Sequence, residues 1–230
     1  MNRTKIDYLN YTWNPTAGCR GLGCAVREKC WAWFQLKRQK PQANGRGCQL
    51  CYEFIPHVHS ERLDEPLSLS KASRIGVSFC GDLYDRDIDP HYRRRTFSIV
   101  NKCARHRFLV LTKQPQNLFF EPYSYPSNLA VGVSVNVYKD KWRIDTLRGA
   151  PVNLRVVSFE PLYEDLGEVN LEDIGWIIIG AQTRPTFIPE TEWVTSLIKQ
   201  AHARDNPVFI KRNYSKFNLE EYPESWKAMS

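Results

Sequence analysis

Closely spaced cysteines are the residues of this chain best suited to chemistry. Cys19, Cys24 and Cys30 lie within the stretch NPTAGCRGLGCAVREKCWAW, and Cys48 and Cys51 follow in GRGCQLCYEF. A reducing compartment disfavours structural disulfides, and an odd total of seven cysteines points the same way. We therefore expect a cysteine-rich metal-binding segment, over residues 14–60.

Two sets of thiols could hold a metal. In the first, Cys19, Cys24 and Cys30 bind three irons of a [4Fe–4S] cluster and leave the fourth iron open for chemistry. In the second, Cys24, Cys30, Cys48 and Cys51 form a four-thiolate zinc site, in which Cys48-x2-Cys51 is the ordinary half. The two sets can coexist if Cys48 and Cys51 bind a second metal or are free thiols.

Other thiol and imidazole side chains have weaker indications. His57 and His59 in FIPHVHSERL could replace one or two cysteines as zinc ligands, although two histidines at this spacing are more often a loop or packing feature. Cys80 and Cys103 fit a strand and a helix as small buried residues.

Apolar runs rich in Val, Ile and Phe recur after residue 73 and predict buried strands. Their continuous hydrophobicity is typical of parallel strands that are covered on both faces. Helical spacing predicts helices at 89–106 and 189–207, which lie between runs. The predicted strands are 74–79, 107–112, 129–135, 154–159, 175–180 and 206–211.

The fold class expected from this pattern is α/β. With YLNYTWNP (residues 8–15) as a first strand, the chain would contain six to seven βα units. These units would close partly or completely into a TIM-barrel-like (βα) barrel, and a doubly wound open sheet is the alternative. No linker composition divides the chain, so one domain over residues 1–230 is expected.

Polar residues follow each predicted strand, where active sites of βα folds form. If 8–15 is the first strand, these residues would converge on the same rim as the cysteine loop. Two carboxylates and two ammonium groups there suit a zwitterionic or phosphorylated ligand, with Asp82 accepting from an amino group and Lys113 or Lys211 facing an anion. The candidate ligand-binding residues are Gly81, Asp82, Lys113, Ser134, Glu160, Gln182 and Lys211.

The net charge of +7 is compatible with a nucleic acid or nucleotide as partner. An alternative function is therefore a noncatalytic zinc-binding barrel that binds nucleic acid or a partner protein, with basic contacts in 36–40 and 91–97. The sequence has no apolar run of about 20 residues and no apolar stretch of the signal-peptide type at its start. We expect a cytoplasmic protein without membrane spans.

The sequence resembles the phage protein Gp thirty-seven/Gp sixty-eight family, a family of unknown function. The resemblance runs along most of the chain and is carried by short motifs around the cysteine loop and the strand ends. These motifs are TWNPTAGC (12–19), KCWA (29–32), ERLDEPL (61–67), GDLYD (81–85), VLTKQPQNL (110–118), LAVGVSV (129–135), VSFEPL (157–162), WIIIGAQT (176–183) and PVFIK (207–211).

That family is similar to radical S-adenosylmethionine enzymes, which place a three-cysteine [4Fe–4S] loop after the first strand of a partial barrel. The resemblance implies that Cys19, Cys24 and Cys30 are the cluster ligands, spaced here by four and then five residues. It implies S-adenosylmethionine as cofactor, with Gly81 and Asp82 near its amino group, and a protein that supplies electrons. The implied activity is that of a radical S-adenosylmethionine enzyme, and the positive charge and the phage association suggest modification of a nucleotide or nucleic acid.

Overall fold

An eight-stranded, mostly parallel sheet forms the centre of the computed structural model, which describes residues 1–230 apart from 22, 44–45, 121–123 and 228–230. The strand order is β1-β2-β5-β6-β7-β8-β9-β12, and within it only β1 is antiparallel to its neighbour. The strands are β1 (Asn2–Arg3), β2 (Tyr11–Trp13), β5 (Arg74–Val77), β6 (Arg107–Thr112), β7 (Leu129–Ser134), β8 (Leu154–Phe159), β9 (Trp176–Ile179) and β12 (Val208–Ile210).

Each predicted strand corresponds to a strand of this sheet, and β6 and β8 have the predicted bounds. The apolar runs are continuous because both faces of the sheet are covered, as the alternation in β9 shows. Ile177 and Ile179 point into the larger core, which also receives the buried side chains of the helices. Trp176 and Ile178 point to the opposite face, into a smaller core that includes Phe209.

Helices occupy some of the links between strands. The predicted helix after β5 is α3 (Pro90–Lys102), and its first turn is capped by Asp89, whose side chain accepts a hydrogen bond from the His91 backbone N–H at 2.7 Å. The helix predicted before β12 is α5 (Thr191–His202), and α4 (Trp142–Arg148) lies between β7 and β8. A 3-10 helix, Pro115–Phe120, follows β6, and no α-helix lies in the described chain between β8 and β9. The expected count of six to seven βα units is therefore not confirmed.

The sheet is curved but open. Tyr8, just before β2, packs edge-on against Trp176 of β9 and Phe209 of β12, with ring centroids 5.7 and 5.6 Å apart. This contact brings the N-terminal segment to the last strands, yet the pairings among the described residues do not join β12 to β1 or β2. No closed barrel is found, and the strand order lacks the reversal that a doubly wound sheet contains.

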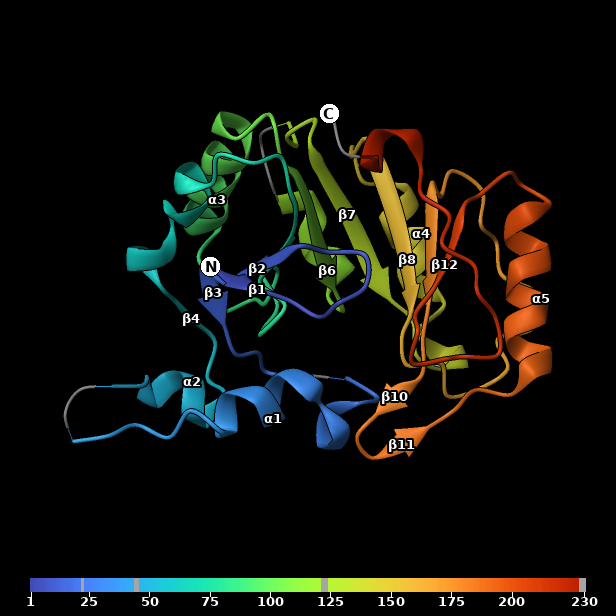
Figure 1. Ribbon diagram of the computed structural model, residues 1–230, viewed down its shortest axis with the longest axis horizontal. Helices are drawn as coiled ribbons and strands as arrows, with labels where there is room; N and C mark the ends of the chain where they lie inside the picture. The colour runs from blue at the N-terminus through green and yellow to red at the C-terminus, as the bar shows by residue number, and fades with distance from the viewer. Residues whose placement is uncertain (22, 44–45, 121–123, 228–230) are drawn as a thin grey trace.

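The segments that carry Cys19, Cys24, Cys30, Cys48 and Cys51 lie at the carboxyl end of the parallel sheet. Figure 1 shows α1 (Trp31–Lys37), α2 (Gln49–Glu53) and the hairpin of β10 (Gln182–Thr183) and β11 (Thr186–Phe187) along the lower edge of the molecule. A second small sheet pairs β3 (Thr16–Ala17) with β4 (His57–Val58). In the described part of the chain, no helix combines the length and the apolar character needed to cross a membrane.

Candidate metal and ligand site

The cysteine loop lies against the loop that follows β5. The backbone N–H of Gly18 donates to the carbonyl of Cys80 at 3.0 Å, and Gly18 and Gly81 form an isolated parallel bridge. A side chain at position 81 has no room, because a Cβ there would lie 2.5 Å from the carbonyl oxygen of Gly18. The chain therefore brings Cys19, which follows Gly18, to the carboxyl end of the parallel sheet, where the loop after its first parallel strand lies.

The three thiols of this loop are free and partly buried. Burial raises the pKa of the Cys19 thiol to about 12, and Asp82 and Cys30 raise it further because their negative charges oppose ionisation. Cys19 and Cys30 are thus electrostatic neighbours. Cys24 lies beside Tyr163, whose pKa is raised by burial and by the charge of Cys24. The loop therefore extends from the β5 end of the sheet to the loop after β8.

A fourth thiol lies near this group. Cys80 was expected to be a packing residue, and it does contact the small apolar cluster of Ala17, Leu36 and Cys51. Burial raises the pKa of Cys80 to about 11, with a smaller contribution from Cys30. Cys80 therefore lies close to Cys30 as well, a proximity that no spacing between the two residues predicts.

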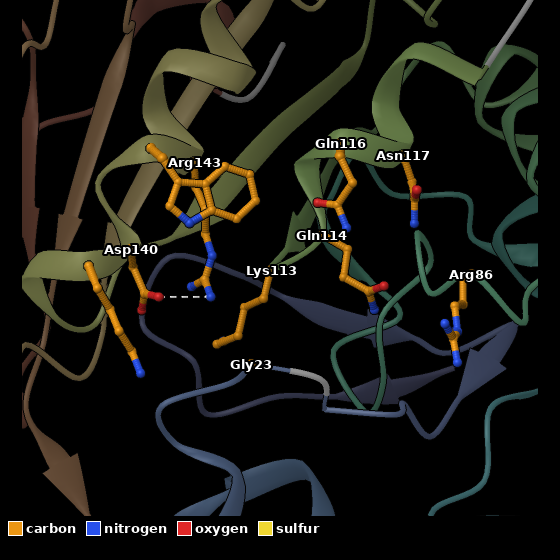
Figure 2. Close-up of a pocket in the computed structure, with 10 residues that line it drawn as sticks. Gly23, Arg86, Lys113, Gln114, Gln116, Asn117, Asp140 and Arg143 are labelled. Atoms are coloured by element: carbon orange, nitrogen blue, oxygen red, sulfur yellow. Dashed lines mark ion pairs between the residues drawn. The ribbon is translucent and has the colours of Figure 1, made fainter.

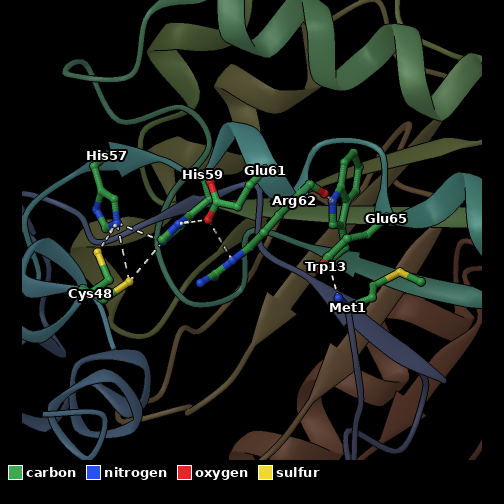
Figure 3. A network of polar contacts seen from close by, with 9 residues as sticks. Met1, Trp13, Cys48, His57, His59, Glu61, Arg62 and Glu65 are labelled. Atoms are coloured by element: carbon green, nitrogen blue, oxygen red, sulfur yellow. Dashed lines mark hydrogen bonds and ion pairs between the residues drawn. The ribbon is translucent and has the colours of Figure 1, made fainter. Parts of the chain in front are cut away.

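Cys48, Cys51, His57 and His59 form a compact cluster, with one donor atom from each within 4.8 Å of every other (Figure 3). The His57 and His59 Nε2 atoms are 2.9 Å apart. The His57 Nε2 lies 3.5 Å from the Sγ atoms of both Cys48 and Cys51, and the His59 Nε2 lies 3.2 Å from Cys51 Sγ. The four donors could hold one metal ion. His57 and His59, rather than Cys24 and Cys30, lie with Cys48 and Cys51. The structure therefore favours the alternative in which the two histidines replace two cysteines of the four-thiolate set.

Asp82 has its carboxylate engaged within the protein. Its oxygens accept hydrogen bonds from the Thr112 hydroxyl at 2.8 and 2.9 Å, from the Lys113 backbone N–H at 3.0 Å and from the Tyr84 backbone N–H at 2.9 Å. Burial raises the pKa of Asp82, and these hydrogen bonds oppose the rise because they stabilise the carboxylate. Asp82 thereby joins the β5 loop to the end of β6, beside Cys19.

The remaining strand-end residues lie farther along the carboxyl end of the sheet. Glu160, which follows β8, forms an ion pair with Lys211, which follows β12. The side chains of both residues lie beside Gly180. Gln182 is 8% exposed, and neither its amide oxygen nor its amide nitrogen has a hydrogen-bond partner among the described residues. The backbone carbonyl of Ser134 accepts from Arg143 at 2.8 Å. The predicted rim therefore contains two groups, one around Asp82 and Lys113 and one around Glu160 and Lys211.

A pocket of about 450 Å³ opens between the cysteine loop and the loops after β6 and β7 (Figure 2). Of the predicted residues, Lys113 lines it, and the cysteine loop contributes Gly23. The other lining residues are Arg86, Gln114, Gln116, Asn117, Lys139, Asp140, Trp142 and Arg143. Sequence reasoning missed these because they lie beyond the strand ends, in loops, in the 3-10 helices Pro115–Phe120 and Tyr138–Asp140, and at the start of α4.

Several pocket side chains are held in place by neighbours. The Gln114 amide donates to Asp85 at 3.0 Å, and the Asn117 amide donates to the carbonyl of Tyr84 at 2.7 Å. Arg143 pairs with Asp140 at 2.9 Å, so this pair contributes no net charge. Lys113 and Lys139 bring positive charge to the pocket wall, and Arg86 adds a guanidinium whose Nε lies 3.8 Å from a carboxylate oxygen of Asp87. The pocket is thus cationic, with amide groups for hydrogen bonding and one exposed indole from Trp142.

No curated protein and no solved structure matches this sequence. Residues 3–226 match the family described as protein of unknown function (DUF5131). The match covers nearly the whole length of the chain, and it includes the cysteine loop, the Cys/His cluster and the pocket. The chain therefore belongs to the DUF5131 family of proteins of unknown function.

Proposed function

We propose that the protein is an iron–sulfur enzyme of the radical S-adenosylmethionine type that modifies a nucleotide or nucleic acid. The observation that carries the proposal is the division of the cysteines. Cys48 and Cys51 already have partners in His57 and His59, which leaves Cys19, Cys24 and Cys30 as a set of three on the loop after the first parallel strand. The curved parallel sheet, with its strands in chain order, supports a partial (βα) barrel as the scaffold.

The residues present fit a cluster with three protein ligands. The thiols are free, and Cys19 and Cys30 interact electrostatically. Burial is the main cause of the raised pKa of Cys19, and a cationic metal centre would favour the thiolate there. Cys19, Cys24 and Cys30 would hold such a cluster, which would supply a binding position for S-adenosylmethionine and an electron, received from a reductant protein, for its cleavage. The buried, unpartnered amide of Gln182 could hydrogen-bond to a ligand on this edge of the sheet.

The pocket favours a phosphate-bearing substrate. Lys113, Lys139 and Arg86 can attract phosphate oxygens, and the 46% exposed Trp142 offers an indole face on which a base can stack. Gln116 adds an amide that can hydrogen-bond to a base edge. A nucleotide unit carries a phosphate and a base together, which is the combination that this wall can bind.

Cleavage of the cofactor is the direct test of the enzyme class. Protein purified without oxygen and reconstituted with iron and sulfide is incubated with dithionite and S-adenosylmethionine, and released 5′-deoxyadenosine is measured by chromatography. Wild-type protein and Cys103→Ser should release it, because Cys103 lies at the end of α3 and outside the site. Cys30→Ser should not. Release that is equal in all three proteins, or absent from the iron-loaded wild type, would overturn the proposal.

The substrate class is tested by binding. Lys139→Ala should weaken the binding of a 5′-phosphorylated single-stranded oligonucleotide and reduce the dependence of its affinity on salt, because a phosphate contact is lost. The matched control is Lys102→Ala, in the last turn of α3 and outside the pocket. Fluorescence anisotropy at two salt concentrations measures both effects. Equal affinities for the two variants would contradict the assignment of this pocket.

A noncatalytic zinc protein that binds nucleic acid is the second candidate function. The Cys/His cluster favours it, because two thiols and two imidazoles suit zinc without any iron. This candidate predicts colourless protein that contains zinc, binds the oligonucleotide and releases no 5′-deoxyadenosine after anaerobic reconstitution. The same measurements therefore separate the two functions.

A further inference from the structure

The cluster of Cys48, Cys51, His57 and His59 has the donor chemistry of a closed metal site. Its donors are two sulfur and two nitrogen atoms, and both imidazoles direct Nε2 toward the thiols. A tetrahedral set of two sulfurs and two nitrogens is typical of structural zinc. Four protein donors fill a tetrahedral shell and leave no position for a substrate, so the expected role is structural.

The outer nitrogen of each imidazole is also held. The His59 Nδ1 lies 2.8 Å from a carboxylate oxygen of Glu61, and the His57 Nδ1 lies 2.7 Å from the backbone carbonyl of Ile55. Each of these acceptors favours a proton on Nδ1, which leaves Nε2 with its lone pair directed into the cluster. Two histidines in a packing role would not need this matching arrangement of acceptors.

The local fold brings the four ligands together over a short stretch. Cys48 and Cys51 lie at the start and inside of the one-turn helix α2, which ends at Phe54 in the left-handed conformation. The chain then reverses and runs as β4, so that His57 and His59 return past the two thiols. A metal ion would link the two thiols before this reversal to the two imidazoles after it.

The same segment holds the cysteine loop. Strand β4 pairs with β3, in the register Thr16 to Val58 and Ala17 to His57, and the His59 backbone N–H donates to the Pro15 carbonyl at 2.7 Å. Gly18 packs so closely that a Cβ would lie 2.2 Å from the carbonyl oxygen of Ile55. The ligands of the cluster are thus adjacent, through the backbone, to the residues that lead directly into Cys19.

We propose that Cys48, Cys51, His57 and His59 bind one Zn²⁺, and that this zinc clamps the 48–59 segment onto β3 and so positions the cysteine loop. Glu61 is a positioning residue that orients His59. The zinc site does not rest on the proposed enzyme function. Protein that contains zinc but no iron would support the zinc site and contradict the enzyme function. Protein that contains iron but no zinc would overturn the zinc site and leave the enzyme function unaffected.

Zinc content is measured by inductively coupled plasma mass spectrometry on purified protein. Wild-type protein should contain about one zinc per chain, and Cys51→Ala and His59→Ala should lose it. Cys103→Ala and the triple variant Cys19→Ala/Cys24→Ala/Cys30→Ala should keep it. A wild type that binds no zinc even when zinc is supplied, or zinc that disappears with the triple variant, would overturn the site.

Cobalt provides a readout that needs no variant. Co²⁺ alone, added to metal-free wild-type protein, should give the intense visible bands of tetrahedral Co²⁺ together with thiolate charge-transfer absorption. The weak spectrum of octahedral Co²⁺ would contradict the four-ligand assignment. Competition with a chelating dye then measures affinity, and Glu61→Gln should weaken zinc binding by about 10- to 100-fold. Its control is Glu53→Gln in α2, which contacts Gln49 and none of the ligands; equal affinities for the two variants would overturn the role of Glu61.

The clamp is tested by hydrogen exchange. Removal of zinc should speed exchange of the His59 amide, which donates to the Pro15 carbonyl across the contact between the segments. It should also speed exchange of the Gly18 amide, which donates to the Cys80 carbonyl and lies against Ile55, while the Val110 amide in β6 keeps its rate. Unchanged protection of His59 and Gly18 after zinc removal would show that the metal does not position the loop.

Discussion

Substitution of Gly18 by alanine tests the contact between the cysteine loop and the zinc segment. Gly18 has φ of +74°, and a Cβ there would lie 2.2 Å from the oxygen and 2.5 Å from the carbon of the Ile55 carbonyl. The left-handed conformation costs alanine about 1 kcal/mol relative to glycine. Displacing backbone atoms that cannot rotate away adds about 1–3 kcal/mol. Gly18→Ala should therefore lower the free energy of unfolding by about 2–4 kcal/mol.

Gly167 offers a matched control for this change. Its φ is +57°, and a Cβ there meets nothing within 4 Å, so Gly167→Ala carries only the conformational cost of about 1 kcal/mol. Denaturant unfolding of both variants, in zinc-loaded protein, measures the difference from the midpoints and slopes. Gly18→Ala should also weaken zinc binding, because the 48–59 segment must shift. Equal destabilisation by the two substitutions would refute the close approach on which the clamp depends.

Further predictions concern stability. Asp140→Ala should lower the free energy of unfolding by about 3–5 kcal/mol, because it leaves the charge of the buried Arg143 unpaired. In the same unfolding assay, Asp145→Ala should cost less than about 1 kcal/mol, because it breaks only an exposed ion pair on α4. Burial lowers the pKa of His106 below its ordinary value of 6.5, so the unfolded chain binds more protons there and stability should fall as pH drops below about 6.5. His106→Gln should reduce that slope by up to about 1.4 kcal/mol per pH unit in unfolding measured across pH, and an unchanged slope would contradict the assignment to His106.

The strands could be predicted from the sequence because their hydrophobicity is continuous. Runs such as 107–112 and 154–159 are covered on both faces, so burial alone marks their limits, and β6 and β8 have the predicted bounds. The closure of the barrel could not be predicted in this way. It depends on how far the sheet curves, and here Tyr8 and its neighbours fill the concave face beside Trp176 and Phe209. The link after β8 also has no α-helix, since loop side chains such as Leu166 and Leu171 cover the core instead.

The thiols of the candidate metal site could be predicted from the sequence. The imidazoles that lie with them could be predicted less well. Spacing identified Cys48 and Cys51 as half of a metal site, but His57 and His59 are distinguished only by the reversal after Phe54, which brings the imidazoles back to the thiols. The pocket illustrates the same limit. Its cationic side chains and its indole come from the segments between strands and from the start of α4. Tertiary packing brings them together, and no periodic pattern in the sequence predicts that packing.

Iron content decides whether Cys19, Cys24 and Cys30 hold an iron–sulfur cluster. Protein purified and reconstituted without oxygen is analysed for iron and zinc together, as wild type, Cys30→Ser and Cys103→Ser. We expect about four irons and one zinc per chain in the wild type and in Cys103→Ser, with the iron lost and the zinc kept in Cys30→Ser. A wild type that takes up zinc but no iron, or a Cys30→Ser variant with its full iron content, would show that these three thiols do not hold an iron–sulfur cluster.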